Sequence, residues 1–227
     1  MSQPMPVAVG EGYFLRFPVQ DILHALVLKQ AALLHYLHAS IVLCGSGLIV
    51  AQGAMQRMAD EAADDVSFLS LGVLRGITKR HEDFLSAFWA DYMEDPAATT
   101  GPPKPNQVRR EKILAALHDG SENPSRMSDI AKQLHKTYSG FIHASSANVM
   151  DLFDAYECTF RVDGGPDYLL ESYAEDLWNY VYRGGLAYIA AAKAFHSDAL
   201  VLRLEASIIK FQDDCGRDGD YGDKAQQ

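Results

Sequence analysis

The sequence DILHALVLKQAALLHYLHASIVLC, residues 21–44, decides the fold class of this chain. It is rich in Leu, Ala and His and contains neither Gly nor Pro, which is typical of a buried helix. No Lys, Arg, Asp or Glu occurs between Lys29 and Arg57, so this run is long enough to span a bilayer. The run also contains histidines and glutamines, and Gly-Ser-Gly at 45–47 interrupts it. These features instead favour two buried helical segments that meet at a turn.

Helical periodicity extends over most of the remaining chain. We expect residues 48–95 to form one long helix or two collinear ones, and residues 168–195 to form another. Residues 95–107 carry four of the nine prolines and are predicted to be a loop between two helical halves. No period-2 alternation is long enough for a strand. The prediction is an all-α fold, a bundle of long antiparallel helices.

The composition is that of one soluble globular domain, with 227 residues, 48% hydrophobic and 22% charged. A net charge of −10 argues against a general nucleic-acid-binding surface. Three cysteines without C-x-x-C spacing predict free thiols and a cytoplasmic location, with no membrane partner. We expect an N-terminal segment at 1–18, a helical domain at 19–212 and a disordered acidic tail at 213–227.

Charged residues gather at regular spacing near the middle of the first half. Arg57 and Glu61 lie four residues apart, as do Glu61 and Asp65, and Asp60 and Asp64. Residues at this spacing share a helix face. Two such carboxylates can bind a divalent cation, but metal sites in helical bundles usually combine Glu and His from several helices. The favoured interpretation is a solvated or ion-paired helix face, with no metal and no cofactor.

The sequence RGITKRH at 75–81 places an Arg and a His six residues apart. This heptad resembles the motif of the HEPN ribonuclease superfamily, which is also all-helical. The resemblance implies that Arg75 holds the scissile phosphate of an RNA and that His81 is the general base, with no metal needed. Gly76 departs from the motif, which usually has a polar residue there. His81 also falls on an apolar stripe, which favours a buried structural histidine.

Two further patterns suggest other chemistries. Ser139 and His143 are co-facial on a helix and could be a nucleophile and its base, but no orienting acid or oxyanion site accompanies them. A contact between helices is the favoured interpretation of this pair. Residues 109–117 and 127–134 resemble the helix-turn-helix of winged-helix regulators, although the expected recognition helix has little Arg or Lys to reach DNA.

Three segments taken together resemble a family of uncharacterised all-helical bacterial proteins. They are residues 56–69, residues 138–143 followed by MDLF at 150–153, and DLWNY at 176–180 with Arg183. The resemblance spans roughly residues 30 to 195 and implies a helical fold and a cytoplasmic location, without an activity. It nominates eight polar positions that would form a pocket if they converge: Arg57, Asp60, Glu61, Asp65, Tyr138, His143, Asn179 and Arg183.

We therefore expect a binding or accessory protein without catalysis, which forms a homo-oligomer or binds a protein partner through its helices. An acidic bundle with long apolar stripes often buries one of them against another chain. The alternative is a metal-independent ribonuclease that uses Arg75 with His81, or an arrangement around His143. A helix-turn-helix DNA-binding regulator is the second alternative.

Overall fold

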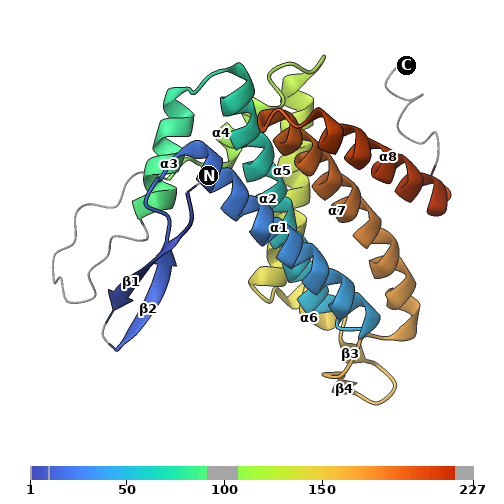
Figure 1. Cartoon of the computed structure of the whole chain (residues 1–227). Helices are drawn as coiled ribbons and strands as arrows, with labels where there is room; N and C mark the ends of the chain where they lie inside the picture. The colour runs from blue at the N-terminus through green and yellow to red at the C-terminus, as the bar shows by residue number, and fades with distance from the viewer. Residues whose placement is uncertain (1, 10, 91–106, 218–227) are drawn as a thin grey trace.

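The computed structural model describes residues 2–9, 11–90 and 107–217 of the chain. Over these ranges the chain forms eight α-helices and two pairs of short strands, which confirms the all-α class (Figure 1). Of the proline-rich loop expected at 95–107, only residue 107 belongs to the described ranges. Residues 218–227 of the expected acidic tail also lie outside them.

Three long helices build the centre of the fold: α1 (Ile22–Gly45), α2 (Ile49–Arg75) and α7 (Asp167–Ala194). Asp21 caps α1, since its carboxylate accepts a hydrogen bond from the backbone N–H of His24 at 2.9 Å. Gly47 has a φ of +70°, which allows the chain to reverse tightly between α1 and α2. The core between the three helices contains fully buried apolar side chains, among them Leu26, Leu33, Val66, Leu69 and Ala191.

The helix or collinear pair predicted for residues 48–95 is wrong, because the chain turns back after Arg75. Gly76 has a φ of +104°, a conformation that glycine adopts without strain, and α3 begins at Lys79 and ends at Ala90. His81 on α3 contacts Phe68 on α2, with their rings stacked at 4.1 Å. Arg75 and His81 therefore belong to different helices.

The region from 108 to 160 is more broken than its periodicity predicts. The helices α4 (Arg110–Leu117) and α5 (Pro124–Ile142) are followed by the short α6 (Ser146–Met150). Asn123 caps α5 by accepting a hydrogen bond from the N–H of Arg126 at 3.1 Å. Ala144, with a φ of +47°, lies between α5 and α6. The antiparallel strands β3 (Phe153–Asp154) and β4 (Thr159–Phe160) follow α6, although the sequence shows no alternation long enough to predict a strand.

The two ends of the described chain add a hairpin and a last helix. Strands β1 (Met5–Val9) and β2 (Gly12–Arg16) pair antiparallel, with Met5 opposite Arg16. The sequence analysis missed them because each is only five residues long, and neither MPVAV nor GYFLR alternates polar with apolar side chains. Helix α8 (Asp198–Asp214) packs against α7, and it extends two residues into the segment expected to be a disordered tail.

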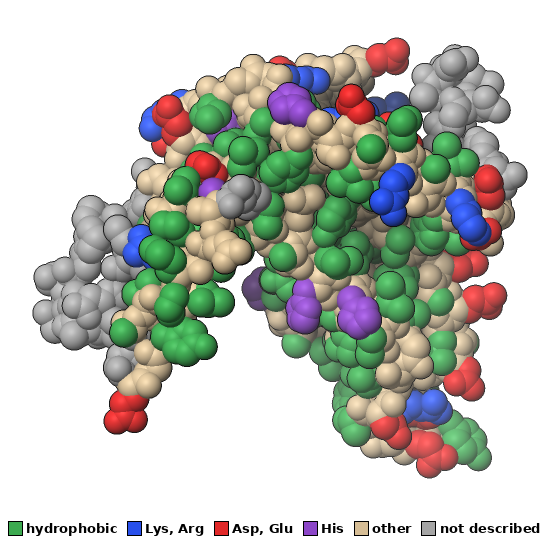
Figure 2. Space-filling model, in the orientation of Figure 1, with side chains coloured by type: hydrophobic (Ala, Val, Ile, Leu, Met, Phe, Trp, Pro, Cys, Tyr) green, Lys and Arg blue, Asp and Glu red, His purple; other side chains and the backbone are tan. Residues whose placement is uncertain are grey.

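Helix α1 is long and apolar enough to cross a membrane, judged by length and composition alone. In the fold it packs against α2 and α7, while Leu34, Ile41 and Val42 are about half exposed. Hydrophobic side chains accordingly lie along the face of the molecule on which α1 runs (Figure 2).

Candidate functional site

A stripe of polar side chains runs along the buried face of α2. Gln52, Gln56, Asp60 and Asp64 follow one another at intervals of four residues, and none is more than 6% exposed. The Gln52 amide donates a hydrogen bond to the backbone carbonyl of Tyr173 at 2.7 Å, which ties α2 to α7. Buried polar groups at this density are costly unless they are paired, so their partners decide what the stripe can do.

His135 on α5 and Arg183 on α7 both contact the two aspartates. His135 Nε2 lies 3.0 Å from Asp60 Oδ2 and 3.2 Å from Asp64 Oδ2. Arg183 contacts the other carboxylate oxygen of Asp60, and its second terminal nitrogen lies 3.6 Å from Asp64. We call Asp60, Asp64, His135 and Arg183 the buried polar centre. It joins three helices at one point.

Each charge in the buried polar centre changes the pKa of its neighbours. Burial acts to raise the pKa of Asp60, but the hydrogen bond from His135 and the charge of Arg183 outweigh it and hold that pKa below its usual range. Burial acts to lower the pKa of His135, but the hydrogen bonds to Asp60 and Asp64 outweigh it and raise the pKa. The fold therefore favours an ionised Asp60 and a protonated His135.

A second group of ion pairs lies beside the first on α2. Asp65 pairs with Lys29 of α1 and with Arg110 of α4, both at 2.7 Å, and Arg57 pairs with Glu61 at 2.5 Å. The expectation of an ion-paired helix face is met, but that of a solvated face is wrong: Arg57, Asp60, Asp64 and Asp65 are all buried. The acids of α2 thus connect four neighbouring helices.

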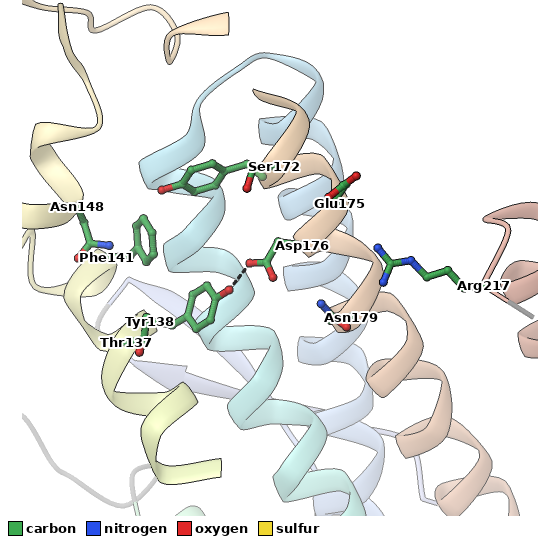
Figure 3. Close-up of a pocket in the computed structure, with 10 residues that line it drawn as sticks. Thr137, Tyr138, Phe141, Asn148, Ser172, Glu175, Asp176, Asn179 and Arg217 are labelled. Atoms are coloured by element: carbon green, nitrogen blue, oxygen red, sulfur yellow. Dashed lines mark hydrogen bonds between the residues drawn. The ribbon is translucent and has the colours of Figure 1, made fainter. Parts of the chain in front are cut away.

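A cavity of about 500 Å³ opens between α5 and α7, next to the buried polar centre. Its lining residues are Thr137, Tyr138, Phe141, Asn148, Ser172, Tyr173, Glu175, Asp176, Asn179 and Arg217. The Tyr138 hydroxyl donates a hydrogen bond to Asp176 across the cavity wall (Figure 3). Burial and this hydrogen bond raise the pKa of Tyr138, so its hydroxyl stays protonated.

Tyr138 connects the cavity to the buried polar centre. Its ring meets that of Tyr180 edge to face, with 5.5 Å between the centroids. Burial and the neighbouring Tyr138 raise the pKa of Tyr180, and the negative charge of Asp60 raises it further. Tyr138 therefore contacts both the cavity and Tyr180, whose hydroxyl is close enough to Asp60 for its charge to act on it.

No protein-family model matches this chain, and no curated protein or solved structure is significantly similar to it.

The structure brings together some of the eight nominated positions and separates others. Arg57, Asp60, Glu61 and Arg183 lie in or beside the buried polar centre, and Tyr138 and Asn179 line the cavity. Asp65 instead pairs with Lys29 and Arg110. His143 is exposed at the end of α5. Ser139 is half-buried, and no side-chain hydrogen bond joins it to His143 within the described part of the chain.

Arg75 and His81 border a second cavity, of about 490 Å³. His81 is only 5% exposed and stacks on Phe68. Its Nδ1 accepts a hydrogen bond from the Thr78 N–H at 3.1 Å, so its Nε2 carries the proton and donates to the Phe68 carbonyl at 3.0 Å. Burial also lowers the pKa of His81. Both ring nitrogens are thus engaged within the protein.

The proposed helix-turn-helix residues have other contacts. Arg110, which begins α4, is paired with Asp65, so its charge is directed into the bundle. Helix α5 is continuous from Pro124 to Ile142 and packs against α2. This arrangement offers no separate recognition helix among the described residues of this region.

Sequence reasoning missed two central residues, His135 and Asp176. His135 lies far from Asp60 along the chain, and a single histidine in an amphipathic helix gives no warning of a carboxylate partner. Asp176 belongs to the quoted segment DLWNY, but nothing in its spacing pointed to Tyr138. The one available signal was the four-residue spacing of Asp60 and Asp64. This spacing shows that they share a helix face, but it does not show which side chains of other helices contact them.

Proposed function

We propose that this chain is a binding protein whose small-molecule ligand occupies the cavity between α5 and α7. The observation that carries the proposal is the lining of that cavity, which combines aromatic rings with carboxylates. Tyr138, Phe141 and Tyr173 supply the rings, and Glu175 and Asp176 supply the carboxylates. The volume of about 500 Å³ is in the range of sites that hold small organic molecules.

The chemistry of the lining favours a ligand with a cationic end attached to a flat or apolar body. Aromatic faces attract organic cations, and carboxylates add charge-assisted hydrogen bonds. Tyr138 contacts Phe141 and Phe141 contacts Tyr173, with 5.8 and 6.0 Å between ring centroids, so the rings form one continuous wall. Arg217 lies at the edge of the cavity, 4.7 Å from the Trp178 ring, where it can contact an acceptor group of the ligand.

A matched pair of probes tests this proposal. Phenethylamine and 3-phenylpropionate share a phenyl ring and differ in the charge of the end group. We expect phenethylamine at millimolar concentration to raise the melting temperature and to bind in calorimetry, and 3-phenylpropionate to do neither. Ser172→Tyr, which fills the cavity, should abolish the effect. Ala174→Tyr, on an exposed position of the same helix outside the lining, should leave it unchanged.

Equal responses to both probes, or a response that survives Ser172→Tyr, would contradict the proposal.

We also propose that the chain acts in the cytoplasm, which its three free cysteines support.

The exposed apolar face of α1 supports self-association as part of this function. Leu34, Ile41 and Val42 are 60%, 50% and 53% exposed on one helix. Exposed apolar side chains at this spacing lie on one side of the helix and favour burial against a second copy. Light scattering coupled to size exclusion should show a dimer or larger assembly, which Leu34→Glu with Ile41→Glu should convert to a monomer. A wild-type monomer at high micromolar concentration would refute self-association.

A metal-independent ribonuclease is the second candidate, because Arg75 and His81 border one cavity. The inward hydrogen bonds of His81 count against it, since a general base needs a free nitrogen. RNA cleavage by the wild type in EDTA, lost in a folded His81→Ala variant, would establish it. Intact RNA after incubation with folded wild type would remove it.

A further inference from the structure

We infer that Asp60, Asp64 and His135 form a binding site for a divalent metal ion. Each of the three offers a ligand atom, and these atoms lie within 4.8 Å of one another, close enough to bind one ion together. The ligands come from two helices that pack against each other, α2 and α5. Each of the three residues is less than 9% exposed. Packing against neighbouring side chains therefore keeps the three ligand atoms in place.

A separate observation on the same stripe supports a bound group. Gln56 precedes Asp60 by one helical turn on the buried face of α2, and it is fully buried. Neither its amide oxygen nor its amide nitrogen has a hydrogen-bond partner among the described residues. A buried amide left unpaired costs free energy, and a hydrated ion in the neighbouring centre would provide partners for it.

The donor set selects the class of metal. Two carboxylates and one imidazole suit Zn²⁺, Mn²⁺, Fe²⁺ or Co²⁺, whereas Ca²⁺ prefers oxygen ligands alone.

Arg183 is the competitor for this ion. Its guanidinium contacts both aspartates and neutralises the carboxylate charge that a metal ion would bind. The Arg183 side chain is 36% exposed, so its charged end can move into water when an ion binds. The two kinds of substitution should consequently act in opposite directions: loss of a ligand weakens binding, and loss of the Arg183 charge strengthens it.

Titration with Co²⁺ tests the site, because the weak visible band of hydrated Co²⁺ intensifies and shifts when protein ligands replace its water in a site of low coordination number. We expect the wild type to bind one Co²⁺ with such a band, and Zn²⁺ to displace it. Asp64→Asn and His135→Asn should each weaken Co²⁺ binding by at least about tenfold. Arg183→Gln should strengthen it.

Asp65→Asn is the matched control. It removes a carboxylate that is equally buried, on the same helix and beside the proposed ligands, but paired with Lys29 and Arg110 instead. Its Co²⁺ affinity should stay within about threefold of the wild type. Circular dichroism of every variant reports whether it is folded.

Three results would overturn the inference: no spectral change in the wild type up to millimolar Co²⁺, equal affinity in all variants, or weaker binding in Arg183→Gln. If a ligand variant fails to fold, the wild-type spectrum and the Arg183→Gln titration still decide. The outcome is independent of phenethylamine binding, because the metal site and the cavity have no lining residue in common.

Discussion

Substitution of Asp65 by Asn tests whether the charges on α2 hold the bundle together. The Asp65 side chain is 4% exposed and pairs with Lys29 and Arg110, whose side chains are 24% and 25% exposed. Removing one partner of a buried ion pair costs about 3–5 kcal/mol. Water can partly screen the two cations left behind, so we expect a loss near the lower end, about 3 kcal/mol. For a chain of this length that corresponds to a melting temperature lower by roughly 6–12 °C.

Urea denaturation followed by circular dichroism measures this loss, with the slope of the transition checked for two-state behaviour. Asp83→Asn is the control, because it removes an exposed carboxylate whose partner Lys79 is solvated, and it should leave stability unchanged. A loss of less than about 1 kcal/mol for Asp65→Asn would refute the reasoning, since the cost of burying the carboxylate would then offset its pairing.

Three other perturbations have expected outcomes. Tyr138→Phe removes the hydroxyl that donates to Asp176 and should lower the free energy of unfolding by about 1.5–3 kcal/mol in urea denaturation. Burial lowers the pKa of His81, so its contribution to stability is complete above its unfolded pKa of about 6.5 and is lost as the pH falls through its folded pKa. Denaturation at pH 7.5 and 5.5 measures that difference. Gly53→Ala places a methyl group 2.6–2.9 Å from ring atoms of Phe141 and should cost about 1–3 kcal/mol in thermal unfolding.

Each of these outcomes has its own control. Tyr156→Phe, at a side chain 92% exposed, should not change stability, and a similar loss in both tyrosine variants would contradict the assigned hydrogen bond. His81→Gln should reduce the difference between the two pH values, and an unchanged difference would assign it to other groups. Gly45→Ala, with no atom near the added methyl group, should be neutral or slightly stabilising, so an equal loss at both glycines would argue against crowding at Phe141.

The long helices could be predicted because their signal is local. Residues 22–45 and 167–194 form α1 and α7 within a residue or two of the expected bounds, since a run without proline allows continuous backbone hydrogen bonding. The reversal at Gly76 could not be predicted in the same way. A single glycine is tolerated within a helix, and only the packing of His81 against Phe68 shows that the chain turns back there.

The candidate site likewise has features that a single helix predicts and features that depend on packing between helices. The helical class and the four-residue spacing that places Asp60 and Asp64 on one face follow from the sequence alone, because both depend on the geometry of a single helix. The burial of this face and its contacts with His135 and Arg183 depend on how the helices pack. Ion pairs and metal ligation depend on side chains only a few ångströms apart, and for residues on different helices that separation is set by how the helices pack.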